Sequence, residues 1–179
     1  AGVEPNAIAA CGVLAGFVPV DAVGEPLGNA VMYNDGRAAA HIGAVENALD
    51  GAGRGLRVVA ADPLPQWLRL RSDLPAIAGG ARHFLDATGW LNFVLTGEAT
   101  LNSFSALRLY GPAVAARLDV ALAAFGRRTD LGEIIGPLRR DIADVVGWRQ
   151  PIPVIAATFD SKCAYVASAL AATGSALDI

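Results

Sequence analysis

Asp160 is the residue whose type and position most directly suggest chemistry. It follows the apolar run 151–157, which predicts a buried strand, and it precedes small residues over 161–172, which predict a helix. A carboxylate at the carboxyl end of a strand lies where α/β folds place their reactive groups. An aspartate just before a helix is also a good N-cap, because its side chain accepts a backbone hydrogen bond. Spacing alone leaves both roles open.

A second polar segment runs from Tyr33 to Arg37 and reads Tyr-Asn-Asp-Gly-Arg. It lies between a short strand that is predicted to end at Tyr33 and a helix predicted over 37–49. The carboxylate of Asp35 and the guanidinium of Arg37 have the chemistry to hold the hydroxyls of a polyol. In the alternative interpretation the segment is a turn, in which Asn34 or Asp35 caps the following helix.

A third segment begins at Thr88 and ends in a polar loop that contains Asn102 and Ser103. Its first part predicts a core helix that Thr88 caps and that continues through Leu95. Gly97 then stands where a left-handed residue ends a helix. The aromatic and aliphatic side chains of this helix are typical of packing rather than of cofactor contacts.

The composition excludes several classes of protein. The chain has 179 residues, of which 54% are hydrophobic and 17% charged, so it can bury a core as one domain, or as one domain plus a piece of another. A net charge of −3 gives no electrostatic basis for binding nucleic acid. No apolar run reaches the roughly 18 residues that a membrane-spanning helix needs. No signal peptide is visible, so we expect a cytoplasmic protein with no nucleic-acid or membrane partner.

Common catalytic and metal-binding motifs are absent from the sequence. There is no phosphate-binding G-x-x-x-x-G-K-[ST] loop, no G-x-G-x-x-G, no G-x-S-x-G and no H-E-x-x-H. His41 and His83 have no metal-ligand spacing. Cys11 and Cys163 are two cysteines far apart, which argues against a disulfide scaffold and a zinc site.

Hydrophobic patterns and turn residues predict an α/β or α+β arrangement. The apolar opening predicts two short strands over 8–21, broken near Ala15-Gly16, and a third over 30–33, all within one antiparallel meander. A strand over 153–157 is expected to lie in a separate sheet and to lead into Asp160. Helices are predicted over 37–49, 63–71, 88–95, 112–125, 138–146 and 161–172, a glycine-rich loop over 51–55, and a last strand over 175–179.

Taken in order, these segments resemble the FGGY carbohydrate kinase family. Its W-N-D-x-R strand end is similar to Tyr33-Asn-Asp-Gly-Arg37, and its Y-L-x-Y-x-L-T-G helix to Trp90-Leu-Asn-Phe-Val-Leu-Thr-Gly97. Its D-x-x-N-A segment is similar to Asn102-Ser-Phe-Ser-Ala106. The strand that delivers its catalytic aspartate, P-V-x-x-G-x-x-D, is similar to Pro153-Val-Ile-Ala-Ala-Thr-Phe-Asp160. Gly174-Ser-Ala-Leu resembles the opening of its G-S-x-x-x-S-G-T segment. The resemblance spans nearly the whole chain.

The resemblance implies an α/β chain that is part of an actin-like, ribonuclease-H-like fold. Residues 1–150 would belong to the N-terminal sugar-binding domain, and residues 151–179 would be the first strand and helix of the C-terminal domain. The N-terminal phosphate hairpin and most of the second domain would lie outside the sequence. The sequence opens with Ala1 and no Met, and Ile179 ends an apolar run that is typical of the start of a strand, so we expect a fragment.

The implied activity is ATP-dependent phosphorylation of a sugar or polyol hydroxyl. Asp160 would be the catalytic base, and Asp35, Arg37, Asn102 and Ser103 would bind substrate. ATP and Mg²⁺ would be held mostly by elements outside this chain, so the chain alone is expected to be inactive. The Asp35 and Asp160 carboxylates are expected in one cleft, on the order of 10 Å apart.

One departure from the family keeps other functions open. Many members carry the polar segment S-G-Q-M-H-G where this chain has Leu14-Ala-Gly-Phe-Val18. The alternative is therefore a non-catalytic sugar-binding or regulatory relative of the same fold. A third hypothesis is an interaction domain in which every polar residue named above acts only as a cap. A homodimer is also left open.

Overall fold

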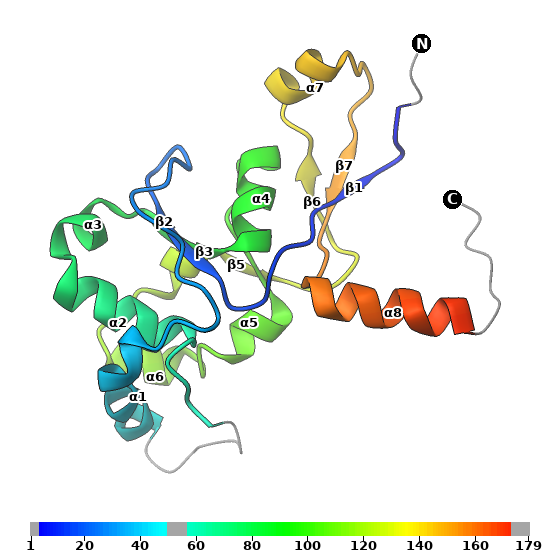
Figure 1. Cartoon of the computed structure of the whole chain (residues 1–179). Helices are drawn as coiled ribbons and strands as arrows, with labels where there is room; N and C mark the ends of the chain where they lie inside the picture. The colour runs from blue at the N-terminus through cyan, green and yellow to red at the C-terminus, as the bar shows by residue number, and fades with distance from the viewer. Residues whose placement is uncertain (1–3, 50–56, 173–179) are drawn as a thin grey trace.

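The computed structural model describes residues 4–49 and 57–172, in which short strands form three small sheets among helices (Figure 1). The expected glycine-rich loop over 51–55, the Gly174 segment and the last strand lie outside the described residues. In chain order the elements are β1 Ile8–Ala9, β2 Phe17–Val20, η1 Arg37–His41, α1 Ile42–Leu49, α2 Pro63–Asp73, α3 Pro75–Gly80, β3 His83–Asp86, α4 Ala87–Thr96, β4 Thr100–Asn102, α5 Ser103–Leu107, α6 Pro112–Arg117, η2 Leu122–Phe125, β5 Arg127–Thr129, β6 Ile134–Pro137, α7 Arg140–Val146, β7 Pro153–Ile155 and α8 Asp160–Ala172.

The main core surrounds the antiparallel pair β2 and β3. All four residues of β2 are buried, as expected of a continuous apolar run that is covered on both faces. The rings of Phe17 and Phe84 stack with their centroids 5.2 Å apart, and Trp67 and Phe125 close around Phe84 at 5.5 and 6.0 Å. This aromatic cluster holds the strands, α2 and η2 together, because each large ring buries apolar area on several neighbours.

A second, three-stranded sheet has the order β1-β7-β6 and its own small core. Strand β1 runs parallel to β7, with Ile8 opposite Val154 and Ala9 opposite Ile155, and β6 pairs antiparallel on the other side of β7. In Figure 1, α7 lies at one end of this sheet and α8 begins at the other. Parallel pairing brings segments from opposite ends of the sequence side by side.

The expected division of the strands between two sheets is wrong. Strands β1 and β2 do not share a meander, and β7 is not in a sheet separate from the N-terminal segment. Between β1 and β2 the chain turns, with Ala15 at φ 53°, and crosses from one sheet to another. The predicted strand over 30–33 is reduced to a single bridge between Val31 and Phe17. The division of the chain into domains at residue 150 stays a prediction.

Most of the predicted helices are confirmed. The segment 37–49 folds as η1 followed by α1, 63–71 lies within α2, and 161–172 lies within α8. Helix α4 contains the predicted 88–95, but Asp86 caps it in place of Thr88. Gly97 adopts the predicted left-handed conformation with φ 83°. For 138–146, the helix observed is the slightly shorter α7.

The long helix predicted over 112–125 is wrong, because the segment forms two short pieces, α6 and η2. Asp119 between them has φ 52°, a left-handed conformation that ends the first piece. The N–H of Val120 then bonds to the carbonyl of Ala115, 2.9 Å away. The bend lets Val114, Val120 and Phe125 all reach the main core, which one straight helix would not achieve.

No helix in the described ranges is both long and apolar enough to cross a membrane.

Candidate functional site

Asp160 stands where β7 leads into α8, and its side chain is exposed to solvent. Its backbone N–H donates to the carbonyl of Gly12, 3.0 Å away, and one carboxylate oxygen accepts from the N–H of Ser161 at 2.8 Å. This bond reaches only the next residue, whereas a full N-cap bonds a residue two or three positions further on. The carboxylate is therefore held at the helix start and still faces solvent.

Gly12 joins the elements that surround Asp160. It forms a parallel bridge with Phe159, and its N–H donates to the hydroxyl of Thr88 at 3.1 Å. A Cβ on Gly12 would lie 2.7 Å from the Cβ of Ala87 and 2.9 Å from the backbone nitrogen of Thr88. The close approach of three backbones therefore requires glycine here. It ties the start of α8 to the start of α4.

Asn102 and Ser103 lie where β4 leads into α5, and the side chain of Asn102 is buried. The amide oxygen of Asn102 accepts from the N–H of Ser105 at 2.9 Å, and its amide nitrogen donates to Asp86 at 2.8 Å and to the Ser105 hydroxyl at 3.0 Å. Ser103, the first residue of α5, is half-buried. The polar atoms of Asn102 are thus engaged inside the protein, so its predicted contact with a substrate stays a prediction.

The Asp86 carboxylate that Asn102 contacts is a buried group that the sequence analysis did not single out. It ends β3, caps α4 by accepting from the N–H of Gly89 at 2.7 Å, and is 2% exposed. Burial raises the pKa of Asp86, and its hydrogen bonds from Gly89, Ser105 and Asn102 act in the opposite direction. The sequence signal for this residue is an aspartate directly before a predicted helix, where its carboxylate can cap the N–H three positions further on, here that of Gly89.

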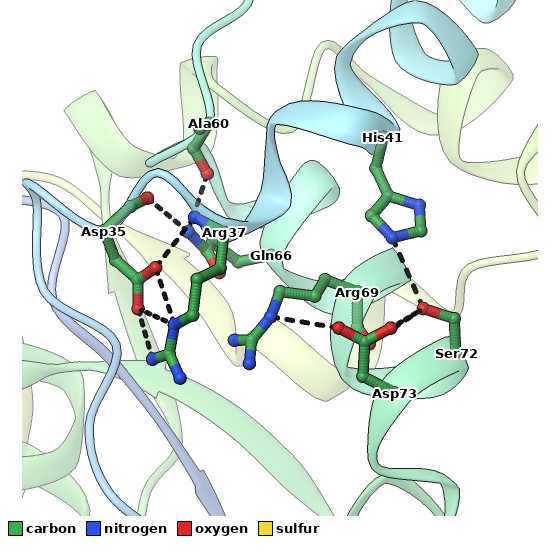
Figure 2. A network of polar contacts seen from close by, with 8 residues as sticks. All are labelled: Asp35, Arg37, His41, Ala60, Gln66, Arg69, Ser72 and Asp73. Atoms are coloured by element: carbon green, nitrogen blue, oxygen red, sulfur yellow. Dashed lines mark hydrogen bonds and ion pairs between the residues drawn. The ribbon is translucent and has the colours of Figure 1, made fainter.

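Asp35 and Arg37 form a pair at the start of η1 (Figure 2). The Nε of Arg37 donates to both carboxylate oxygens of Asp35 at 2.9 and 3.0 Å, and the Arg37 backbone N–H donates to the same carboxylate at 2.9 Å. The side-chain bond from Arg37 lowers the pKa of Asp35 to about 2. Asp35 therefore does fix the turn, while the exposed guanidinium of Arg37 remains open to solvent on one side.

The buried side chain of Gln66 attaches this turn to α2. Its amide nitrogen donates to the carbonyls of Asp35 at 3.2 Å and Ala60 at 2.7 Å. Figure 2 also shows Arg69 paired with Asp73 at 3.3 Å, and the Ser72 hydroxyl between His41 and Asp73. The Asp73 carboxylate contacts the serine and not the ring of His41, so the three residues do not have the order of a nucleophilic triad.

A pocket of about 200 Å³ lies between the segment around Leu14, the start of α2, and α5. Its lining residues are Leu14, Ala15, Phe17, Val59, Ala61, Asp62, Pro63, Phe104, Ser105 and Arg108. The ring of Phe104 lies 5.2 Å from the ring of Phe159, the residue just before Asp160. One wall of the pocket therefore leads to the start of α8.

The charged groups of this pocket are already paired. Arg108 donates to both oxygens of Asp62 at 2.6 Å, and the hydroxyl of Tyr110 donates to the same carboxylate at 2.8 Å. Burial and the neighbouring Asp62 raise the pKa of Tyr110. The sequence analysis missed all three residues, because Asp62 and its two partners are 46 and 48 positions apart and share no motif.

Among residues 4–49 and 57–172, no three His, Cys, Asp or Glu side chains gather as a metal-binding group. Such a group would be a site built from protein side chains alone, whereas a Mg²⁺ ion that arrives with a nucleotide needs only one or two protein carboxylates. The expected proximity of the Asp35 and Asp160 carboxylates stays a prediction. Gln66 of α2 binds the carbonyl of Asp35, whereas Asp160 begins α8, where the ring of Phe159 packs against Phe104 of α5.

No protein-family model matches this sequence, and no curated protein matches it either. Solved structures of carbohydrate kinases do resemble the model. The xylulose kinase from Rhodospirillum rubrum matches with a TM-score of 0.79 and 21% identity over 95% of this chain and 37% of its own. The ligand-bound xylulose kinase from Lactobacillus acidophilus matches with a TM-score of 0.74 and 14% identity over 88% and 35%. The Plasmodium falciparum glycerol kinase with ADP matches with a TM-score of 0.70 and 15% identity over 88% and 35%.

These likenesses show the fold. The chain folds as part of the actin-like architecture of the carbohydrate kinases, and the predicted resemblance is confirmed at that level. It spans about a third of the length of the structures it matches.

Proposed function

We propose that this chain is part of an ATP-dependent kinase of the FGGY carbohydrate kinase family, located in the cytoplasm, which phosphorylates a hydroxyl of a sugar or polyol. The observation that carries the proposal is the position of Asp160: an exposed carboxylate at the carboxyl end of β7, within a fold shared with carbohydrate kinases. ATP would supply the phosphoryl group, with Mg²⁺ to stabilise its charge.

Asp160 would act as the general base that accepts the proton of the attacking hydroxyl. The bond from its backbone N–H to Gly12 and its place at the start of α8 fix the backbone of Asp160 relative to α4. Arg37 would donate to substrate hydroxyls from the side of its guanidinium that Asp35 does not occupy. Asn102 and Ser103 would shape the same region from the start of α5.

The test is the replacement of the carboxylate in the full-length protein that contains this chain. We expect Asp160→Asn to lower kcat by about 10²–10⁴-fold, the range that general-base catalysis contributes. The fold should survive, because the amide oxygen can still accept from the N–H of Ser161. The assay is ADP release across a panel of pentoses, ketoses and polyols, with circular dichroism as the check on folding.

The matched control is Asp119→Asn, because the Asp119 side chain is 97% exposed and pairs with Arg71 far along the chain from Asp160. It should keep normal turnover. Full activity of Asp160→Asn on the best substrate would end the assignment of the base. The 179-residue chain alone should show no sugar-dependent ATP turnover, since a single carboxylate does not stabilise the charge of phosphoryl transfer.

A second candidate function is non-catalytic binding of a sugar. The observation in its favour is the segment 14–18, which lines the pocket with apolar side chains where many members of the family carry the polar segment S-G-Q-M-H-G. Calorimetric binding of a sugar by the full-length protein, without ADP release from any member of the panel, would favour this candidate over the kinase.

A further inference from the structure

The two cysteines of the chain, 152 positions apart in the sequence, are neighbours in the structure. Cys11 directly precedes Gly12, which pairs with Phe159 and accepts the N–H of Asp160. Cys163 lies one helical turn after Phe159, because its own N–H donates to the Phe159 carbonyl at 3.1 Å. The crossing of these two backbones thus places both cysteines at the first turn of α8.

The Cys163 side chain acts directly on the Cys11 thiol, which agrees with the proximity that the backbone pairing gives the two residues. The side chain of Cys11 is exposed, and that of Cys163 is half-buried, so a small molecule in solution can reach the pair. Burial, Cys163 and Asp160 together raise the pKa of Cys11 to about 11. This keeps the Cys11 thiol protonated at neutral pH, which slows its own attack on an oxidant.

We propose that Cys11 and Cys163 form a reversible disulfide and are an oxidative modification site of this protein. The oxidant is a small disulfide such as glutathione disulfide. The thiolate of one cysteine attacks it, which forms a mixed disulfide and releases one small thiol. The second cysteine then attacks the protein sulfur of the mixed disulfide and releases the other small thiol. Two protein thiols are oxidised, one small disulfide is reduced, and the two protons go to the released thiols.

The cross-link would join the segment after β1 to the first turn of α8, on either side of the hydrogen bond between Gly12 and Asp160. It would restrain the backbone that carries the Asp160 carboxylate. The inference does not depend on the role of Asp160, since the proximity of the thiols follows from the pairing of the chain alone.

The experiment treats the reduced full chain with glutathione disulfide and digests it with trypsin without reductant. Because Arg37 is the first cleavage site and Lys162 the last, Cys11 leaves in peptide 1–37 and Cys163 in peptide 163–179. We expect these peptides to be linked, in a protein whose intact mass is that of one chain. The same treatment in concentrated urea should give at least about tenfold less linked peptide, since unfolding opens a long loop between the thiols.

The matched control is the double variant Cys163→Ala with Ala164→Cys, which moves the thiol by one position and about 100° around the helix. It should collect mixed disulfides and little linked peptide, as should Cys11→Ser. Mixed disulfides on both cysteines of the native chain without a linked peptide would overturn the proposal. So would equal linking in native buffer and in urea, or linking only between two chains.

Discussion

Two junctions of this molecule have the same local design and opposite surroundings. At β3–α4, Asp86 ends a strand and caps a helix, and it is 2% exposed with bonds from Gly89 and Asn102. At β7–α8, Asp160 follows a strand and begins a helix, yet it is exposed and bonds to Ser161. The difference teaches that strand–aspartate–helix is a positioning device, and that neighbouring elements decide whether the carboxylate serves the fold or is free for chemistry.

The residue three positions after each aspartate shows the same contrast. At the first junction it is Gly89, where a Cβ would lie 2.2 Å from the carbonyl oxygen of Thr100. At the second junction it is Cys163, whose side chain is half-buried and lies by Cys11. The β3–α4 junction is packed tightly against β4. The β7–α8 junction is accessible to solvent where Cys11 and Cys163 form the proposed disulfide.

The largest expected effect comes from adding a methyl group at Gly89, in the tightly packed β3–α4 junction. Gly89→Ala should lower the free energy of unfolding by about 3 kcal/mol, because the added methyl must displace backbone rather than a flexible side chain. Denaturant unfolding measures it. Gly43→Ala in α1, where a Cβ meets nothing within 4 Å, is the control and should be neutral or slightly stabilising. Equal stability of the two variants would contradict the close packing of the first junction.

Removing each carboxylate in turn separates the two junctions directly. Asp86→Ala should cost about 2 kcal/mol, because α4 loses its cap and the buried amide of Asn102 loses an acceptor. Asp160→Ala should change the free energy of unfolding by no more than about 0.5 kcal/mol, as at other exposed positions. Thermal unfolding of the two variants measures both. A larger loss for Asp160→Ala would make that residue a structural cap.

The raised pKa of Asp86 predicts a pH dependence with a defined sign. The unfolded chain ionises this carboxyl at about pH 3.9, whereas burial delays its ionisation in the folded state. The folded state therefore binds more protons above pH 3.9, so the free energy of unfolding falls as the pH rises through this window. The wild-type chain should lose stability relative to Asp86→Asn as the pH is raised from 3 to 7. A constant difference between the two would contradict the raised pKa.

The smallest expected effect concerns Asp35, which is less buried than Asp86 and less exposed than Asp160. Its depressed pKa gives stability that is present above pH 3.9 and is lost as the pH falls through about 2. Arg37→Gln should raise the pKa of Asp35 toward its ordinary value, measured by NMR titration of the carboxyl carbon. At pH 7 the loss of stability should be small, because the guanidinium of Arg37 is largely exposed to solvent, which screens the pair. An unchanged Asp35 pKa would mean that Arg37 is not its main partner.

The sequence by itself determined the local elements. The helices within 37–49, 63–71, 88–95 and 161–172, the left-handed Gly97 and the strand before Asp160 all follow from patterns within a few residues. The Asp35–Arg37 turn belongs to this group, since its carboxylate bonds a backbone N–H two residues away. The order of the polar segments also sufficed for the resemblance in fold to carbohydrate kinases.

Only the tertiary structure decided which segments meet. Strands of two to four residues, such as β1 and β4, are too short to carry a hydrophobic period, so their partners could not be read from the sequence. The helix breaks after α6 because Val114, Val120 and Phe125 all pack into the main core. The exposure of Asp160, the burial of Asp86 and the meeting of Cys11 with Cys163 depend on elements far apart in the chain. Burial and proximity are properties of what packs around a residue, and the local sequence does not encode them.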